Sequence, residues 1–447
     1  MLSHTSLFRF LVLLLIGFLP LANTFFGRGI YYVLKLNYSE NVSNVLHEMF
    51  IPTNILCFCI LFLRLGSKQT FFPIGSRNWV FPLGTLLWLV GATLSFFSLD
   101  PDPISTAAYV ASYVSPFLIY FCIVGLRFNE KFIKEVVVVI SICSSIPLVL
   151  GLIAFYRTWG IPDFYTLLWA RFDLAGMKDY MDMTFGNNGN TACLLVLILP
   201  PVFSLWIKCK KNSLIGIWLL AVLVLAALNL LIVQSRTAFL VCFIAFILIG
   251  IRHLTFLSYK LVTLALAVGL TYFSYGDFFG TALFLERMET AISFDRIADA
   301  SVDGRVSAMR EGWELFLEQP ITGVGPGITL EANSATSAHQ FNIQQASEIG
   351  ILGLLSSVLL TGAVFSKTIR TLTHNDRESE WKFMLLIGPA MYFLYGLLAN
   401  IVLSLGALNI WVGISFSLIA IVDCFDNQEV TVLAKNHKTA PFGECYR

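Results

Sequence analysis

Three residues of this 447-residue sequence have types and positions that could support phosphate binding or proton transfer: Arg236, Arg305 and His339. Arg236 interrupts two apolar runs, where a guanidinium is costly to bury and well suited to a phosphate group. Arg305 opens an expected helix. His339 precedes an apolar run, and an imidazole can act as a general base. Ordinary alternatives are an interfacial arginine at 236 and a surface or capping histidine at 339.

The segment around Arg305 has a clear local pattern. Asp303 is a plausible N-cap for a helix that continues to Leu317. Val306, Met309, Trp313 and Leu317 recur at helical spacing on one face of that helix. The glycine- and proline-rich stretch 319–327 then predicts the end of the helix and a tight turn. A phosphate-binding loop is the alternative, but the preceding strand, the glycine spacing and the Lys-Ser/Thr pair of such loops are missing.

These residues must be positioned by membrane-spanning helices. Hydrophobic residues make up 57% of the sequence and charged residues only 13%, against about 25% charged in a typical soluble domain. Apolar runs long enough to cross a bilayer recur from end to end. We expect one polytopic all-α membrane domain over 1–447 with about twelve spans. They lie near 8–25, 49–64, 80–98, 107–126, 135–155, 189–207, 214–233, 237–251, 256–274, 346–366, 383–402 and 405–422.

The distribution of Lys and Arg predicts an orientation for these spans. Of the 29 basic residues, 19 fall on the side that holds both termini and 10 on the other side. The positive-inside rule therefore predicts cytoplasmic termini, and places a shorter loop (156–188) and a larger, partly helical loop (275–345, between spans nine and ten) outside. Long outward loops are where binding and chemistry tend to occur. His47 and His339 are then the outward histidines.

Charge and cysteine usage limit the chemistry of these loops. The larger loop has ten carboxylates against four arginines, so any anion site in it must be local. No cysteine falls in an outward loop and no cysteine spacing suggests a metal, so we expect neither a metal site nor a cofactor. A net charge of +1 does not suggest a nucleic-acid partner.

Two further polar features adjoin the outward ends of spans. Asn188 and Asn190 lie in a Gly-Asn-rich stretch ahead of the sixth span, which fits either a helix cap or a sugar-binding role. Glu348 lies near the outer end of the tenth span. Arg310 is five residues after Arg305, so it should point to another side of the helix and is the weaker anion-binding candidate.

The ordered set of these motifs resembles the O-antigen ligase and polymerase superfamily. It comprises Gln234-Ser-Arg236-Thr-Ala, Gly304-Arg305 with Trp313, the 320–327 turn, His339, and Glu348-Ile-Gly350 with Gly353. The Gly186-to-Asn190 stretch is similar to that family's entry to a span, except that Asn188 replaces a frequent proline. The motifs cover roughly 180–360, and the span count fits the whole chain.

The resemblance implies a metal-independent, inverting glycosyltransferase of the bacterial inner membrane with its site on the periplasmic face. The donor would be an undecaprenyl-pyrophosphate-linked glycan, and membrane lipids would surround the site. Arg236 and Arg305 would bind the pyrophosphate, and His339 would accept or orient the attacking hydroxyl. Arg310, Asn188, Asn190 and Glu348 are the further substrate-binding candidates, and Glu348 could instead orient His339 or cap its helix.

Three functions remain open from the sequence. A ligase would transfer the glycan to a sugar of the lipid A core, whereas an O-antigen or exopolysaccharide polymerase would transfer it to another lipid-linked repeat unit. The motifs favour the ligase slightly. A lipid-linked sugar transporter would need charged residues at mid-membrane depth and an internal repeat, and the sequence shows neither.

Overall fold

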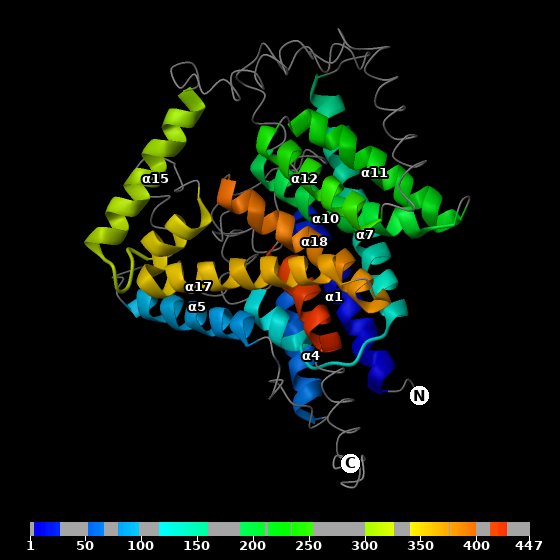
Figure 1. Cartoon of the computed structure of the whole chain (residues 1–447), viewed down its shortest axis with the longest axis horizontal. Coiled ribbons are helices and arrows are strands. Elements are labelled where there is room, and N and C mark those ends of the chain that lie inside the picture. The colour runs from blue at the N-terminus through cyan, green and yellow to red at the C-terminus, as the bar shows by residue number, and fades with distance from the viewer. Residues whose placement is uncertain are drawn as a thin grey trace, which may run out of the picture.

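The fold is helical throughout the part of the chain that the structure describes. This computed structural model covers residues 4–26, 52–66, 79–97, 116–159, 188–210, 213–233, 235–253, 300–325, 340–374, 376–398 and 412–426. Within these ranges every regular element is a helix and there is no strand (Figure 1). The all-α prediction is therefore confirmed.

The helices follow the apolar runs of the sequence closely. They are α1 (His4–Phe26), α4 (Pro52–Gly66), α5 (Val80–Phe97), α7 (Glu130–Trp159), α10 (Asn188–Lys208), α11 (Leu214–Val233), α12 (Arg236–Arg252), α15 (Ala300–Glu318), α17 (Phe341–Thr373) and α18 (Arg377–Leu398). Two more helical stretches cover 116–123 and 412–426.

Among the residues that the structure describes, four helical segments are long and apolar enough to cross a bilayer: Glu130–Leu150, Thr191–Lys208, Phe341–Thr373 and Arg377–Leu398. Shorter apolar helices lie in α1, α4, α5, α11 and α12, and many of them expose large apolar side chains. Exposed apolar surface of this extent is typical of a membrane protein. The count of about twelve spans stays a prediction, since the run 256–274 lies outside the described residues and only 116–126 of the run 107–126 is described.

The helix α17 is the central element for the candidate site, and α5 lies beside it along much of its length (Figure 1). The two run antiparallel. Near one end, the Ser356 hydroxyl donates to the carbonyl of Gly84 at 2.8 Å. Toward the other end, Trp88 Nε1 donates to Gln345 Oε1 at 2.7 Å. A second group of contacts joins α10 to α18, α11 and α12, and a third joins α1 to α7 and α4.

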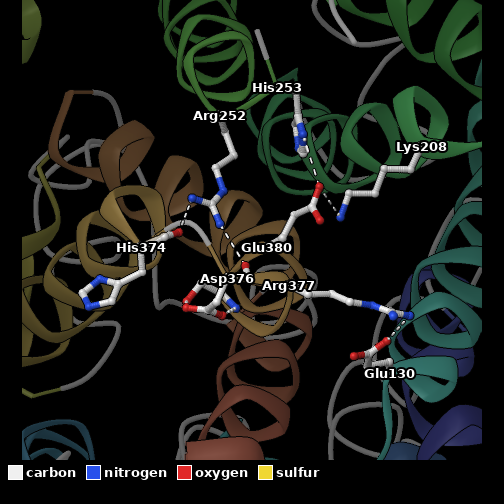
Figure 2. Close-up of polar contacts among 9 residues, drawn as sticks. Glu130, Lys208, Arg252, His253, His374, Asp376, Arg377 and Glu380 are labelled. Atoms are coloured by element: carbon white, nitrogen blue, oxygen red, sulfur yellow. Dashed lines mark hydrogen bonds and ion pairs between the residues drawn. The ribbon is translucent and has the colours of Figure 1, made fainter. Parts of the chain in front are cut away.

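Charged residues gather at the end of the bundle where α10, α12 and α17 finish and α7 and α18 begin. Figure 2 shows Glu380 of α18 facing both Lys208 and His253, and Arg377 paired with Glu130. The Lys208 Nζ to Glu380 Oε1 distance is 2.9 Å, and the Arg377 to Glu130 distance is 2.8 Å. These residues include basic groups that the sequence analysis assigned to one side of the membrane, and the structure brings them to one end of the bundle.

At neutral pH, Glu380 forms its ion pair with Lys208 and not with His253. Burial, together with the Lys208 ammonium, lowers the pKa of His253 to about 4, so its imidazole is neutral at pH 7. His253 Nδ1 lies 3.3 Å from Glu380 Oε1. Lys208 also lies over the ring of Trp381, with its Nζ 4.0 Å from the centroid. Glu380 is thus the group that compensates a largely buried ammonium.

A buried ion pair lies toward the same end. Lys367 of α17 pairs with Asp423 of the helix 412–426, and the Tyr120 hydroxyl donates to the same carboxylate at 2.8 Å. Lys367 is six residues from the end of α17, which is about 9 Å along the axis. The charge is therefore displaced from the middle of the span, in agreement with the scarcity of central charges in the sequence.

Removing the Glu380 charge should destabilise this end of the bundle. We expect Glu380→Gln to lower the free energy of unfolding by about 2 kcal/mol or more, because Lys208 would remain largely buried without its carboxylate. The matched control is Glu314→Gln, which removes a carboxylate from an exposed ion pair with Arg310 and should cost less than about 1 kcal/mol. Thermal unfolding in detergent measures the stability of both variants. Equal decreases in melting temperature would show that the Glu380 contact with Lys208 stabilises the protein no more than an exposed ion pair does.

Candidate active site

The candidate site is built around a break in α17, nine residues into the helix. Gln340 caps its first turn, where the side-chain oxygen accepts a 2.7 Å hydrogen bond from the amide of Ile343. Gly350 then has φ of 72° and ψ of −155°, outside the helical region, and the helix resumes after it. The break separates a short N-terminal segment of α17, which follows His339, from the long apolar part of the helix.

A turn at the end of α15 fills this break, and we refer to the contact between residues 319–325 and 347–351 as the latch. The amide of Val324 donates to the carbonyl of Ser347 at 2.8 Å, and the amide of Gly325 donates to the carbonyl of Glu348 at 3.1 Å. In the opposite direction, the amide of Ile351 donates to the carbonyl of Pro320 at 2.8 Å. The latch therefore fixes the end of α15 to the outer part of α17.

Glycine is required on both sides of the latch. Gly323 has φ of 68° and Gly350 has φ of 72°, a conformation that side chains with a Cβ rarely adopt. A Cβ at 323 would overlap the backbone of Glu348, and a Cβ at 350 would overlap the carbonyl of Ile321. The two backbones approach each other too closely for any other residue.

The tight turn predicted after Leu317 is confirmed over 319–325, and its amides are already in use. The amides of Gly323, Val324 and Gly325 donate to the carbonyls of Gln319, Ser347 and Glu348. An amide that donates to a carbonyl is not free to bind a phosphate. In this conformation the described part of the turn holds two helices together and does not form a phosphate cradle.

Helix α5 supports the outer part of α17 with buried polar contacts. Trp88 donates to Gln345, and the Ser95 hydroxyl donates to the carbonyl of Glu348 at 2.8 Å. The Glu348 side chain is fully buried and accepts a 2.9 Å hydrogen bond from Gln344 Nε2, one turn earlier in α17. The carboxylate is thus held in place within the protein and does not extend into solvent.

The structure describes the backbone positions of Arg236 and Arg305 but not His339. Arg236 is the first residue of α12, directly after the N-cap Ser235, whose side chain accepts from the amide of Ala238. Arg305 is the sixth residue of α15. The side chains of both arginines lie outside the described set, and so does the whole of His339. What the structure brings together is the helix that contains Arg305 and the helix that follows His339.

The weaker candidates are also located in part. Asn188 and Asn190 lie in the first turn of α10, and because their side chains are not among those described, the capping and sugar-binding interpretations both stay predictions. Arg310 is highly exposed and pairs with Glu314 at 3.0 Å. Position 310 is on a different side of α15 from position 305, as their five-residue separation predicted.

The N-cap prediction for Asp303 is wrong. The helix α15 begins at Ala300, so Asp303 lies inside it. Alanine is the best helix former, so α15 can begin at Ala300, upstream of Asp303. Inside the first turn, an aspartate at position 303 is still favoured by the helix dipole.

Sequence reasoning missed the supporting residues of α5 and the buried amides in the first turns of α17. Trp88 and Ser95 lie about 250 residues from their partners, and nothing in the local pattern of an apolar span connects them to α17. Gln344 and Gln345 did carry a signal, because two adjacent amides at the start of an apolar run need partners when they are buried.

Replacing a latch glycine should destabilise the protein. We expect Gly350→Ala and Gly323→Ala each to lower the melting temperature by several degrees, because backbone strain of this kind costs about 1–3 kcal/mol before any overlap is counted. Gly362→Ala is the matched control: it lies on the same helix with nothing within 4 Å of an added Cβ, and should be neutral or slightly stabilising. Thermal unfolding in detergent and limited proteolysis of the 319–325 turn compare the three.

A comparison with known protein families matches the part of the chain that contains the candidate site. A family model described as O-antigen ligase matches residues 221–358, from within α11 to within α17. The matched segment contains Arg236, Arg305, His339 and the entire latch. A search of curated proteins found no match. This match supports the resemblance to the O-antigen ligase and polymerase superfamily that the motifs of the sequence indicated.

Proposed function

We propose that this protein transfers a glycan from undecaprenyl pyrophosphate to a sugar hydroxyl of the lipid A core, on the periplasmic face of the bacterial inner membrane. The general assignment to O-antigen ligase or polymerase-type glycosyl transfer rests on the family match. The donor, the acceptor, the side of the membrane and the residue roles are our proposal.

The latch is the observation that best supports a catalytic centre in this region. It joins two segments that the sequence separates by 20 residues or more, the helix with Arg305 and the helix that follows His339. Catalysis depends on holding such groups in a fixed relation. A connection made through backbone hydrogen bonds, with glycines where the backbones meet, is rigid enough to serve that purpose.

In the proposed mechanism, Arg236 and Arg305 bind the pyrophosphate of the donor. As the glycosidic bond breaks, negative charge grows on the pyrophosphate, and the guanidinium groups stabilise it. His339 accepts the proton of the attacking acceptor hydroxyl, which displaces the pyrophosphate with inversion. The buried Glu348 lies nine residues after His339 and helps to order the segment that carries it. No metal is needed, because the arginines supply the positive charge.

The membrane setting is consistent with this donor. An isoprenoid tail stays in the acyl chains while its pyrophosphate reaches the headgroup level, so the anion site must lie at the end of a span. Arg236 begins α12, directly after the end of α11, and the latch lies at the outer end of α17. Both features are therefore at helix ends, where a membrane-bound pyrophosphate can reach them.

The catalytic assignment can be tested with four variants. We expect His339→Ala to reduce transfer about 10²- to 10⁴-fold through loss of a general base, and Arg305→Ala to reduce it about 10²- to 10³-fold through loss of charge stabilisation. His374→Ala and Arg370→Ala are the controls, since both residues are exposed at the far end of α17. Glycan transfer is measured in membranes with equal protein levels, and unchanged activity in both test variants would refute the assigned roles.

The principal alternative is a polymerase, in which the acceptor is another lipid-linked repeat unit. The purified protein should be incubated with lipid-linked glycan, with and without a lipid A core acceptor. Our proposal predicts glycan on the core acceptor and no lengthening of lipid-linked chains. Longer lipid-linked chains in the absence of the core acceptor would instead establish polymerase activity.

A further inference from the structure

The described side chains of α15 form three arcs, one of which packs against α17. This buried arc contains Ala308 and Phe316. An exposed polar arc contains the charged side chains that the structure describes on this helix, together with Ser307. Its members are Ser307, Arg310, Glu311, Glu314 and Glu318. The third arc is exposed but apolar.

This exposed apolar arc consists of Val306, Trp313 and Leu317, and Ile321 in the following turn extends it. Their exposed fractions are 60%, 42%, 60% and 72%. The first three are spaced by seven and four residues, which places them on one line along a helix. Three of these residues belong to the face that the sequence pattern indicated, of which Met309 is half-buried, and the described part of the chain leaves the other three exposed. A charged arc beside an apolar arc on one helix is typical of a helix that lies in a membrane interface.

A second exposed apolar stripe follows the long part of α17. Ile351, Leu355, Val358 and Ile369 are exposed along it, and Gly362 lies on the same line with open space around it. Their spacing again corresponds to one face of a helix. The stripe covers 19 residues, and its first and last Cα positions are about 27 Å apart along the axis, which is close to the thickness of the hydrocarbon core of a bilayer. Because α17 is a candidate span, this stripe is its lipid-facing side.

The two stripes meet at the latch. Ile351 begins the α17 stripe and donates its amide to Pro320, next to Ile321 at the end of the α15 arc. Figure 1 shows α15 leaving this end of α17 at a steep angle, so that it runs across the direction of the span. A helix that crosses the end of a span in this way lies roughly along the membrane surface.

We propose that α15 is an interfacial helix whose Val306, Trp313, Leu317 and Ile321 side chains enter the lipid surface at the outer end of α17. The occupant of the apolar arc is the bilayer itself, because the arc continues the lipid-facing stripe of a spanning helix. Trp313 suits this depth, since tryptophan favours the boundary between acyl chains and headgroups. The polar arc then faces water, and Arg310 lies beside the headgroups. The proposal does not depend on the glycosyltransferase assignment.

Spin labels at single cysteines can test this placement in vesicles of phosphatidylethanolamine and phosphatidylglycerol, after the reactive native cysteines are replaced. The test positions are Val306→Cys and Leu317→Cys, and the matched controls one residue away are Ser307→Cys and Glu318→Cys. Leu355→Cys provides the lipid-facing reference. Collisions with dissolved oxygen report lipid exposure, and collisions with a water-soluble nickel chelate report exposure to water.

We expect the ratio of oxygen to nickel accessibility at 306 and 317 to approach that at 355 and to exceed that at 307 and 318 several-fold. Equal nickel accessibility at 317 and 318 would overturn the proposal by showing that the arc faces water. Low accessibility to both reagents at 306 and 317 would also overturn it, because a second copy or another protein would then cover the arc. Hydroxyl-radical labelling of Trp313 in the unmodified protein provides a second measurement: protection that is independent of protein density supports lipid, and full labelling contradicts it.

Discussion

Backbone hydrogen bonds between the 319–325 turn and residues 347–351 hold the candidate site together, and they exist because α17 gives up its own pairing at Gly350. In an unbroken helix the carbonyl of Ser347 would accept from the amide of Ile351. Here that carbonyl accepts from Val324, while the amide of Ile351 donates to Pro320. The carbonyl of Glu348 is likewise satisfied by Gly325 and by Ser95. The groups released by the break are thus paired again across the latch, as buried backbone groups must be near a membrane.

The two ends of α17 are stabilised by different forces. At the outer end the contacts are mainly neutral hydrogen bonds and close glycine packing, which fix direction and distance. At the other end, Lys208, Glu380, Lys367 and Asp423 form ion pairs in a largely buried setting. Such pairs are sensitive to the loss of either partner. A change at the charged end should therefore act mainly on assembly of the bundle, whereas a change at the latch alters the relation between the segments on either side of His339.

The sequence was most informative where local composition determines structure. Apolar runs predicted the helices, and glycine with proline predicted the turn after α15, because each depends on neighbouring residues alone. The break at Gly350 could not be predicted in the same way, since a glycine in an apolar helix is often tolerated and only contact with Ile321 requires this conformation. The pairing of Trp88 with Gln345 was equally hidden by distance along the chain. For the candidate site, the sequence identified Arg236, Arg305 and His339 as residue types, while the structure contributes the two helices that contain the arginines and the helix that begins after His339.

A lipid-linked substrate, as in the proposed function, would explain why α15 has a buried, a polar and an apolar surface. If α15 rests in the interface, its height above the bilayer core is set by the apolar arc, and its contact with α17 is set by the latch. By helical spacing, position 305 falls on the same side of α15 as the buried Ala308 and Phe316, whereas the exposed Arg310 would then lie beside the headgroups. A pyrophosphate that moves laterally in the membrane would then meet Arg310 at the surface before it reaches position 305. Under the proposed function, the five-residue separation of these arginines distinguishes an outer contact from an inner one.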